Sequence, residues 1–306
     1  MKILVLYGGV SNERKISLLT GNAILKSLSK KYSVHGYDFN GDYDNIKKIV
    51  TDFDLVFNAL HGGEGENGIV QNFFEKNNIK YTGSSSNAAK IAMNKHLAKE
   101  ICFDNSIKTP DWIYFTESLC IDKVARFNSK SIVVKPADEG SSIGLSIIKN
   151  FDDGNKSKIS ELNLAVEKCK NVSENILIEE YIAGREVTVG ILGNMTLPIL
   201  EIIPENFYYD YECKYLKGKS HYVVPAKIDK NIENQLKNLS LKIFNLLNCA
   251  NYGRIDYRIS EDNKIYFLEI NTLPGFTETS LFPKAAKAIS LDYDKLLEKI
   301  ILLAKK

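Results

Sequence analysis

The chain has 306 residues, of which 44% are hydrophobic and 25% charged, the composition of an ordinary globular protein with room for about two or three domains. The formal net charge is only +2 and the lysines are dispersed, which argues against the basic surface of a nucleic-acid-binding protein. No apolar run approaches the ~18 residues of a membrane span, and the apolar run at the N-terminus is too short for a signal peptide.

Cysteine usage indicates a reducing compartment. The sequence has five cysteines, an odd number, and their spacing forms neither a CxxC pair nor a Cys/His cluster. We therefore expect a cytoplasmic protein whose cysteines fill the core without forming disulfides. They are Cys102, Cys120, Cys169, Cys213 and Cys249.

The first part of the chain, to about residue 83, alternates between short apolar runs and segments in which apolar residues recur at helical spacing. The predicted strands are residues 3–7, 34–39, 55–58 and 80–81, and the predicted helices are residues 11–29 and 68–77. Alternation of strands and helices is typical of an α/β unit with a parallel sheet.

Two glycine-rich turns lie in this unit. Gly8-Gly9 follows the first strand but belongs to no GxGxxG motif, so it is only weak support for a dinucleotide site. Glu13, just before the next helix, is compatible with gripping a ligand ammonium group or with partnering the helix dipole. The turn from His61 to Gly68 is not a P-loop, because no Lys-Ser/Thr follows its last glycine; it either approaches a ligand or is a flexible loop.

Two lysines stand out in the middle of the chain. Residues 84–102 are predicted as one helix, on which Lys95 by itself is typical of a surface residue. The apolar strand 131–136 ends around Lys135, and a glycine- and serine-rich loop leads into a return strand at 145–148. Such a loop can donate backbone N–H groups to phosphates, with the lysine as a point charge. The alternative is a plain hairpin turn, although the loop is longer than a tight hairpin needs.

An acidic hinge follows this hairpin. Residues 176–180 and 187–192 are predicted strands, and the segment from Glu179 to Glu186 connects them. An extended hinge offers backbone groups to an adenine edge, and Glu186 offers a carboxylate to ribose hydroxyls. A domain linker with surface charges is the alternative.

Residues 205–226 are rich in aromatic residues and have little periodicity. This pattern predicts an Ω-type loop that is packed by its own tyrosines, and long loops of this kind often act as lids. The predicted helices that follow are an amphipathic helix at 231–248 and a closing helix from Asp292 onward.

The segment 252–280 predicts two antiparallel strands and a turn. The first strand alternates apolar with charged residues, the second, 265–270, is aliphatic and aromatic, and turn residues occupy 261–264. If the loop between the strands has two residues, one face of the hairpin brings four polar side chains opposite one another. They are Arg254, Asp256, Glu269 and Asn271.

This hairpin face has the composition of a magnesium site. Two carboxylates and an amide oxygen are hard ligands, and an arginine beside them suits phosphoryl oxygens. A solvated face is the alternative, but Glu269 interrupts an apolar run, so we expect it to be partly buried and partnered. The turn at 271–275 can present backbone N–H groups to an anion.

Several segments together resemble one known family. The lysine strand with EGSSIG, the hinge EEYIAGREVTV, and GRIDYR with FLEINTLPGFTETS look like the ATP-grasp superfamily, and most closely like D-alanine–D-alanine ligases. The segments LYGGVSNERKISL, HGGEGENG, YTGSSSNAAKIAMNKH and YDYECKYLKGKSHYVVPA also resemble that family. The resemblance runs from residue 3 to about residue 283.

The resemblance implies an α/β fold, of α+β type in its ATP-grasp part. It implies an N-terminal parallel-sheet α/β substrate domain over residues 1–92 and a central ATP-grasp subdomain over 93–182. Residues 183–306 would form the C-terminal ATP-grasp subdomain, with the metal-binding hairpin and the lid loop.

The resemblance also implies roles for individual residues. The implied ATP-binding residues are Lys95, Lys135, Ser142, Glu179, Glu180, Ile182 and Glu186. The implied ligands of two Mg²⁺ (or Mn²⁺) ions are Asp256, Glu269 and Asn271. The implied catalytic residues are Glu13, Ser141, Tyr215, Arg254 and Gly275. The implied substrate contacts are His61, Lys214, Ser280 and Leu281.

In this assignment Glu13 holds the ammonium of a first D-alanine, and Ser141 links it to Tyr215 of the lid. Arg254 and the Gly275 amide stabilise a tetrahedral oxyanion. The second D-alanine places its carboxylate at Ser280 and the Leu281 amide. In the family, phenylalanine in place of the lid tyrosine accompanies depsipeptide formation with lactate, so the tyrosine here favours a second alanine.

The implied reaction has two steps. The carboxylate of the first D-alanine attacks the γ-phosphoryl group of ATP, and the amine of the second then displaces phosphate from the acyl phosphate. The implied partners are D-alanine, ATP and a second copy of the chain, with no nucleic acid and no membrane. The alternatives are another ATP-grasp carboxylate–amine ligase, a nucleotide-binding regulatory protein with a dead site, and more distantly a Rossmann dehydrogenase.

Overall fold

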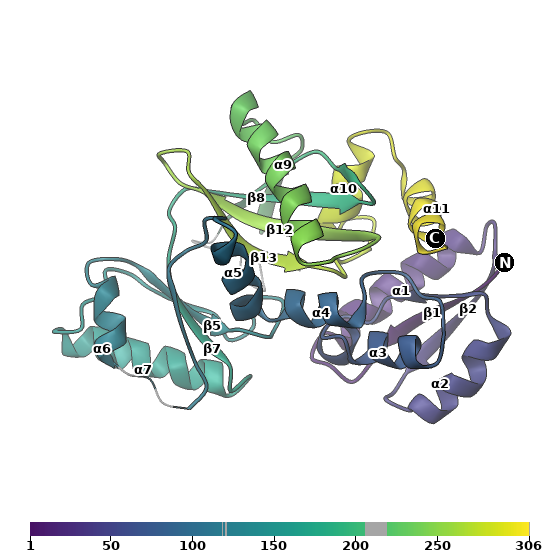
Figure 1. Cartoon of the computed structure of the whole chain (residues 1–306), viewed down its shortest axis with the longest axis horizontal. Helices are drawn as coiled ribbons and strands as arrows, with labels where there is room; N and C mark the ends of the chain where they lie inside the picture. Colours follow the sequence, from purple (N-terminus) through teal and green to yellow (C-terminus); the bar gives the residue numbers. More distant parts are fainter. Residues whose placement is uncertain (118, 120, 206–218, 306) are drawn as a thin grey trace.

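The computed structural model describes residues 1–117, 119, 121–205 and 219–305. Within these residues the strands form three sheets, which follow one another along the chain (Figure 1). No helix in the described part combines the length and apolar character that crossing a bilayer demands.

The N-terminal sheet is parallel, as predicted, with the strand order β2-β1-β3. Its strands are β1 (Lys2–Gly8), β2 (Ser33–Phe39) and β3 (Leu55–Asn58), and its helices are α1 (Arg14–Leu28), α2 (Tyr43–Ile49) and α3 (Ile69–Lys76). The predicted strand at 80–81 is only a parallel bridge from Tyr81 to Val56. The helix α2 was not predicted.

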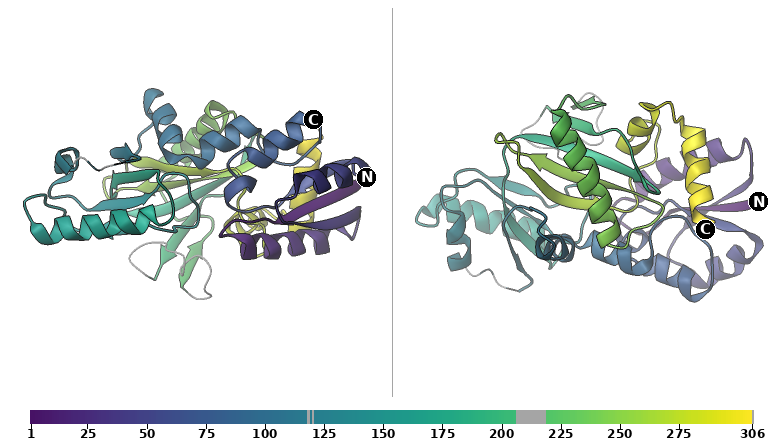
Figure 2. Two further views of the ribbon diagram at one scale, coloured as in Figure 1. Left: turned by 90° about the horizontal axis from the view of Figure 1, so that it is seen from below. Right: turned by 45° about the horizontal axis from the view of Figure 1, so that its top comes forward.

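Helices cover both faces of this sheet. The core on one face joins β1 and α1 to the last helices of the chain, α10 (Leu281–Lys287) and α11 (Tyr293–Ala304), whereas the other face packs against α2 and α3. Figure 2 shows α11, in yellow, beside the purple N-terminal part. The C-terminus of the chain is therefore built into the domain that the N-terminus begins.

The prediction of one helix over 84–102 is wrong. The structure has two helices, α4 (Ser86–Met93) and α5 (Lys95–Asp104), separated at Asn94. Asn94 has an extended backbone conformation, and its side chain accepts a hydrogen bond from the amide of Leu97. This cap starts a new helix, so that Lys95 is the first residue of α5.

The central sheet is antiparallel, with the order β4-β7-β5-β6. Its strands are β4 (Trp112–Phe115), β5 (Ile132–Pro136), β6 (Ser146–Ile148) and β7 (Ile176–Glu180). Helix α7 (Lys156–Lys170) and the short helix α6 (Ile121–Val124) cover one face. Three single turns of 3₁₀ helix, η1 (Val50–Asp52), η2 (Gly63–Gly65) and η3 (Ala125–Phe127), occur among the described residues.

The C-terminal sheet is also antiparallel, with the order β11-β10-β8-β12-β13 and β9 paired to β8. Its strands are β8 (Arg185–Leu192), β9 (Met195–Thr196), β10 (Leu200–Pro204), β11 (Ser220–Val223), β12 (Tyr252–Ile259) and β13 (Ile265–Asn271). Helix α9 (Lys230–Leu246) lies across one face, and α5 packs into the same core (Figure 1). Because β11 is a strand, the predicted irregular loop at 205–226 is wrong at its end; residues 206–218 lie outside the described part.

The hairpin of β12 and β13 has the predicted register where the polar face lies. Asp256 pairs with Glu269 and Arg254 with Asn271, as expected. The register arises in a different way from the one predicted. The prediction assumed a loop of two residues, whereas residues 260–264 form a longer turn. The register shifts by one between Asp256 and Tyr257, so a β-bulge offsets the longer turn.

Three of the five cysteines lie in the described part, and all three are buried free thiols. They are Cys102, Cys169 and Cys249. Burial raises the pKa of each thiol to about 12, so these thiols are protonated and unreactive at neutral pH. This agrees with the expectation that cysteines fill the core. Cys120 and Cys213 lie outside the described residues.

Candidate active site

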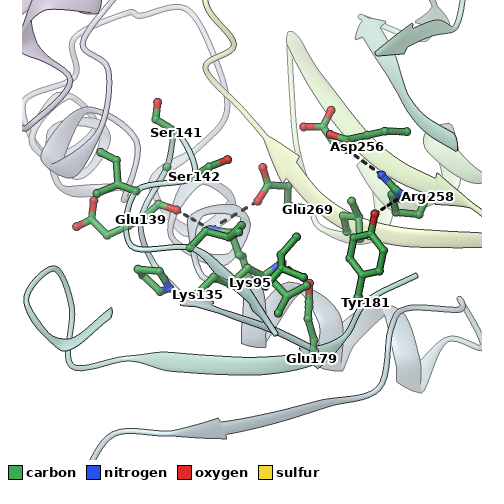
Figure 3. A pocket seen from close by; sticks show the side chains of 18 of the residues that line it. Lys95, Lys135, Glu139, Ser141, Ser142, Glu179, Tyr181, Asp256, Arg258 and Glu269 are labelled. Carbon is green, nitrogen blue, oxygen red and sulfur yellow. Dashed lines mark hydrogen bonds and ion pairs between the residues drawn. The ribbon is translucent and has the colours of Figure 1, made fainter. Parts of the chain in front are cut away.

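A pocket lies between the uncovered faces of the two antiparallel sheets (Figure 3). Because successive side chains of a strand point to opposite faces of the sheet, every second residue of a strand lines the pocket wall. On β5, Val133 and Lys135 face the pocket, while Ile132 and Val134 join the core under α7. On β12 the residues that face the pocket are Arg254, Asp256 and Arg258.

Lys95 points into this pocket from the first turn of α5. Its Nζ donates to the backbone oxygen of Glu139 at 2.6 Å and lies 3.6 Å from Oε2 of Glu269 (Figure 3). Its residue exposure is 8%, so the interpretation of Lys95 as an ordinary surface lysine is wrong. Lys95 is buried because the cap at Asn94 redirects the chain before α5 and turns this lysine into the pocket.

Lys135 is part of a buried charge triad on the floor of the pocket, which we define as Lys99, Lys135 and Glu179. Nζ of Lys135 contacts Oε1 of Glu179, and Nζ of Lys99 donates to Oε2 of the same carboxylate at 2.9 Å. Burial alone raises the pKa of Glu179, but the two lysine charges outweigh it and hold that pKa below its usual value. The carboxylate is therefore ionised at neutral pH.

Glu179 was predicted as a hinge residue for adenine, and it does line the pocket next to the hinge residues Glu180 and Ile182. The residue is only 2% exposed, and its side chain is held by the two lysines of the triad. Sequence reasoning missed Lys99, which is 0% exposed. The available signal was its position four residues after Lys95, which places both on one side of a helix.

The hinge after β7 is fixed by Arg258, a residue that was not predicted to be part of the site. Its guanidinium donates to the backbone oxygens of Ile182 and Gly184, both at 2.9 Å. It also donates to the Tyr181 hydroxyl at 3.2 Å (Figure 3) and to Glu186 at 3.1 Å. The predicted ribose-binding carboxylate of Glu186 thus lines the pocket as the partner of Arg258.

Glu180, the last residue of β7, also lines the pocket. Its carboxylate accepts from Lys130 at 2.9 Å, and both side chains are partly exposed, at 26% and 42%. A pair this exposed contributes little to stability, so the site does not depend on it for its shape.

The polar hairpin face forms the opposite wall. Arg254 donates to both carboxylate oxygens of Asp256, through Nε at 2.9 Å and Nη2 at 2.8 Å, and Thr188 donates to Oδ1 at 2.6 Å. Glu269 is partly buried, with 31% of its side chain exposed, and is paired with Lys95, as its apolar surroundings predicted.

The oxygens on this face fit a hard divalent cation. Asp256, Glu269 and Asn271 each line a pocket, and a carboxylate or amide oxygen that accepts one hydrogen bond has a further lone pair for a metal. Asn271 Oδ1, for example, accepts from the Leu273 amide at 2.9 Å. Among the described residues no three His, Cys, Asp or Glu side chains gather into one metal-binding group; the predicted set contains two carboxylates and one amide.

The glycine- and serine-rich loop between β5 and β6 closes one end of the pocket. Ser141 and Ser142 both adopt positive φ, 53° and 57°, an uncommon conformation outside glycine. The Ser141 hydroxyl donates to Oε1 of Glu13. Asp138 anchors the start of the loop by accepting from Ser173 at 2.6 Å and from Asn175 at 2.7 Å. Glu13 and Ser141, two predicted site residues that lie 128 residues apart in the sequence, are thereby brought together.

A second pocket adjoins the first on the other side of this loop. Four residues line both pockets and therefore mark their junction: Gly140, Ser141, Arg254 and Glu269. All the predicted catalytic and substrate-contact residues that the structure describes line the second pocket. Besides Ser141 and Arg254, these are Glu13, His61, Gly275, Ser280 and Leu281.

His61 is held rigidly at the edge of the second pocket. Its Nδ1 lies 3.2 Å from Oε1 of Glu66, and its Nε2 lies 3.0 Å from the Thr20 hydroxyl. Gly62 is required beside it, because its φ is +68° and a Cβ there would lie 2.9 Å from Oε2 of Glu13.

The turn before α10 shapes the far end of the second pocket. Ser280 Oγ accepts from the Thr277 amide at 3.1 Å and lies 2.7 Å from the Thr277 hydroxyl. A Cβ on Gly275 would lie 3.1 Å from Ser280 Oγ, so the backbone approaches this serine closely. The remaining two predicted site residues, Lys214 and Tyr215, lie outside the described residues.

Two family models match the chain. The model of the D-ala D-ala ligase C-terminus matches residues 105–302, and the model of the D-ala D-ala ligase N-terminus matches residues 39–84. A D-alanine–D-alanine ligase from Aquifex aeolicus is 40% identical over 303 residues, covering 98% of this chain and 100% of that protein.

Solved structures agree with these sequence matches. The D-alanine–D-alanine ligase from Bacillus anthracis complexed with ATP aligns with a TM-score of 0.86 at 31% identity, covering 100% of this chain and 97% of that chain. The VanG D-Ala:D-Ser ligase from Enterococcus faecalis aligns with a TM-score of 0.83 at 25% identity, covering 99% of both chains.

Proposed function

Because the chain belongs to the D-alanine–D-alanine ligase family, we infer that it is an ATP-dependent ligase that joins two D-alanines for peptidoglycan precursor synthesis. The first D-alanine carboxylate attacks the γ-phosphorus of ATP, the bond to the β–γ bridging oxygen breaks, and ADP leaves. The amine of the second D-alanine then attacks the acyl carbon, and inorganic phosphate leaves as the peptide bond forms.

We infer the roles of individual residues from one observation, which is that the two pockets meet at a junction. Phosphoryl transfer requires the γ-phosphoryl group and the attacking carboxylate to meet in line. Ser141, Arg254 and Glu269 line both pockets. We therefore place the nucleotide in the first pocket, the amino acids in the second, and the transferred group at the junction.

The first pocket suits ATP along its whole length. At the junction end, Lys95 and Lys135 supply positive charge for phosphate oxygens, and Ser142 and the amides of its loop cover them. At the other end the backbone of the hinge, at Glu179 to Ile182, receives the adenine. Glu186 takes the ribose hydroxyls while Arg258 holds it in place. Glu180 lies at the rim.

Asp256, Glu269 and Asn271 are the residues that would hold two Mg²⁺ or Mn²⁺ ions in this proposal. When bound, such ions neutralise charge on the transferring phosphoryl group and on the leaving ADP. Arg254 fixes the orientation of Asp256 through its two hydrogen bonds. The ion pair between Lys95 and Glu269 connects α5 to the hairpin and holds the Glu269 carboxylate in place.

The amino acids occupy the second pocket in this proposal. Glu13, which accepts from Ser141, receives the ammonium of the first D-alanine, with His61 beside it. Ser280 and the Leu281 amide bind the carboxylate of the second. Arg254 and the Gly275 amide stabilise the oxyanion of the tetrahedral intermediate, which develops negative charge on the acyl oxygen.

Several parts of the proposal rest on the resemblance alone. They are the positioning role of Tyr215, substrate contact by Lys214, the domain limits 1–92, 93–182 and 183–306, and assembly as a homodimer. Cytoplasmic localisation rests on cysteine usage. Sedimentation of the purified protein tests the dimer directly, since a monomer at micromolar concentration contradicts it.

The experiment that tests the function is phosphate release with ATP and Mg²⁺ in the presence of D-alanine, L-alanine or no amino acid. We expect release that depends on D-alanine and a dipeptide product detected by mass spectrometry. Release that D-alanine does not stimulate would overturn the assignment.

A second candidate keeps the first step and changes the acceptor. The VanG D-Ala:D-Ser ligase shares the fold over 99% of this chain, so D-serine is the acceptor to compare. Mixed incubations with D-alanine and D-serine, analysed by mass, distinguish the two. A predominant D-alanyl-D-serine product favours the second candidate.

A further inference from the structure

Lys99 is a buried lysine for which the proposed mechanism has no use. It is 0% exposed, on α5, and is not among the described residues that line either pocket. Its Nζ lies 2.9 Å from Glu179 Oε2 and 5.1 Å from the centre of the Trp112 ring. A lysine charge is costly to bury, so its presence behind the pocket wall calls for a physical reason.

The charge triad has a definite order from inside to outside. Lys99 lies behind Glu179, Glu179 lies in the pocket wall, and Lys135 lies in the pocket on the other carboxylate oxygen. Without Lys99, Glu179 and Lys135 form a neutral pair, and the carboxylate cancels most of the lysine's attraction for an anion. With Lys99, the triad carries a net positive charge, and the only member of it that is both cationic and in the pocket wall is Lys135.

We propose that Lys99 is a positioning residue for nucleotide binding: it neutralises and orients Glu179 from behind, so that the charge of Lys135 acts on the nucleotide phosphates. The proposal rests on the nucleotide site proposed above. Lys99 does not itself touch the nucleotide.

The electrostatics of the triad agree with this arrangement. Burial lowers the pKa of Lys99 to about 8, although Glu179 favours its charged form. Lys99 is therefore still mostly protonated at neutral pH, and its charge is available to Glu179. Glu179 in turn has a pKa below its usual value, so the pair is ionic rather than neutral.

The test measures binding of Mg·ADP by calorimetry in the absence of D-alanine. We expect Lys99→Met to weaken ADP binding roughly 10- to 100-fold, because the carboxylate of Glu179 then cancels the charge of Lys135. Lys99→Gln should lose as much, since it retains a hydrogen-bond donor for Glu179 but no charge. The matched control is Cys102→Ala, one turn further along α5 and equally buried, which should bind ADP within about twofold of wild type.

A double-mutant cycle locates the effect. In a Glu179→Gln background, Lys99→Met should change ADP affinity less than about threefold, because the carboxylate through which Lys99 acts is gone. A Lys99→Met loss of the same size in both backgrounds overturns the proposal, as does a Lys99→Gln variant that binds ADP like wild type. If Lys99→Met does not fold, Lys99→Gln alone decides by the same criterion.

The readout separates this proposal from the proposed function. ADP binding does not require turnover, so a wild-type protein that binds ADP but ignores D-alanine refutes only the ligase assignment. A ligase that turns over normally, and whose Lys99 variants bind ADP normally, refutes only the role of Lys99. For active variants, the effect should appear in KM for ATP, with kcat and KM for D-alanine changed less than about threefold.

Discussion

Replacing Arg258 with methionine should loosen the hinge to which we assign the adenine. The guanidinium makes four hydrogen bonds to that hinge, to Tyr181, Ile182, Gly184 and Glu186. Only 10% of its side chain is exposed. Because one planar guanidinium makes all four hydrogen bonds, its removal leaves all four partners without this donor at once.

The expected cost follows from burial. Removing one partner of a buried ion pair that is also hydrogen-bonded typically costs about 3–5 kcal/mol, because the remaining charge and carbonyl oxygens lose their partner. At about 2–4 °C per kcal/mol for a domain of this size, the melting temperature should fall by roughly 6–20 °C. The KM for ATP should rise at least about 10-fold, because the hinge no longer holds one geometry.

The chain offers a matched control on the neighbouring strand. Arg185 donates to both oxygens of Glu201, at 2.7 and 2.6 Å, and to the Lys227 carbonyl at 2.9 Å. Its side chain is 38% exposed and lines neither pocket among the described residues. Arg185→Met should therefore cost about 1 kcal/mol or less and leave the KM for ATP unchanged.

Thermal melts and steady-state kinetics on both variants decide the matter. The reasoning is refuted if Arg258→Met melts no lower than Arg185→Met, or if its KM for ATP stays within about twofold of wild type. A large loss of stability with an unchanged KM would mean that Arg258 supports the fold but not the hinge.

Three further predictions concern the metal face, the acceptor and the divalent cation. Asp256→Asn and Glu269→Gln should each lower the rate of ADP formation at least about 100-fold, measured with D-alanine; near-normal turnover in both would sink the metal assignment. Tyr215→Phe should relax discrimination against D-lactate, measured as the ratio of depsipeptide to dipeptide; an unchanged ratio counts against its role. Chelation of divalent cations with EDTA should weaken ADP binding itself at least about 10-fold, measured by calorimetry; equal affinity with and without EDTA contradicts this.

The sequence predicted the hairpin register correctly for a reason that was only partly right. Alternation of apolar and charged residues determines which residues of β12 face the pocket. Turn length is less visible, because residues 260–264 suit several turn types. The pairs Asp256–Glu269 and Arg254–Asn271 occur because a bulge follows them, and a bulge has no reliable signature in a single sequence.

Residues that act through tertiary contacts were not predictable from local pattern. Lys99 and Arg258 look like any charged residue on a helix or strand, and only the packing of α5 and β12 on the two sheets shows what they contact. Lys95 was identified by family resemblance rather than by its surroundings. Its burial depends on the break at Asn94, where a side-chain cap overrode good helix-forming residues on both sides.

The charges that line the proposed nucleotide pocket indicate that a divalent cation should favour nucleotide binding as well as the reaction itself. Among the residues that the structure describes, six carboxylates and four cationic side chains line the pocket, so this part of its wall has more acid than base. Each of those cations is already paired with one carboxylate of the wall: Lys95 with Glu269, Lys135 with Glu179, Arg254 with Asp256, and Arg258 with Glu186.

A bare triphosphate therefore meets a wall whose cations are already engaged and whose acidic groups repel it. Lys99 adds one positive charge from behind the wall, which relieves the floor of the pocket but not the hairpin face. At that face the acidic groups that repel free ATP are the ones that we propose to bind a divalent cation. The same residues thus favour metal-bound nucleotide over free nucleotide, which is why EDTA should weaken binding before any bond is broken.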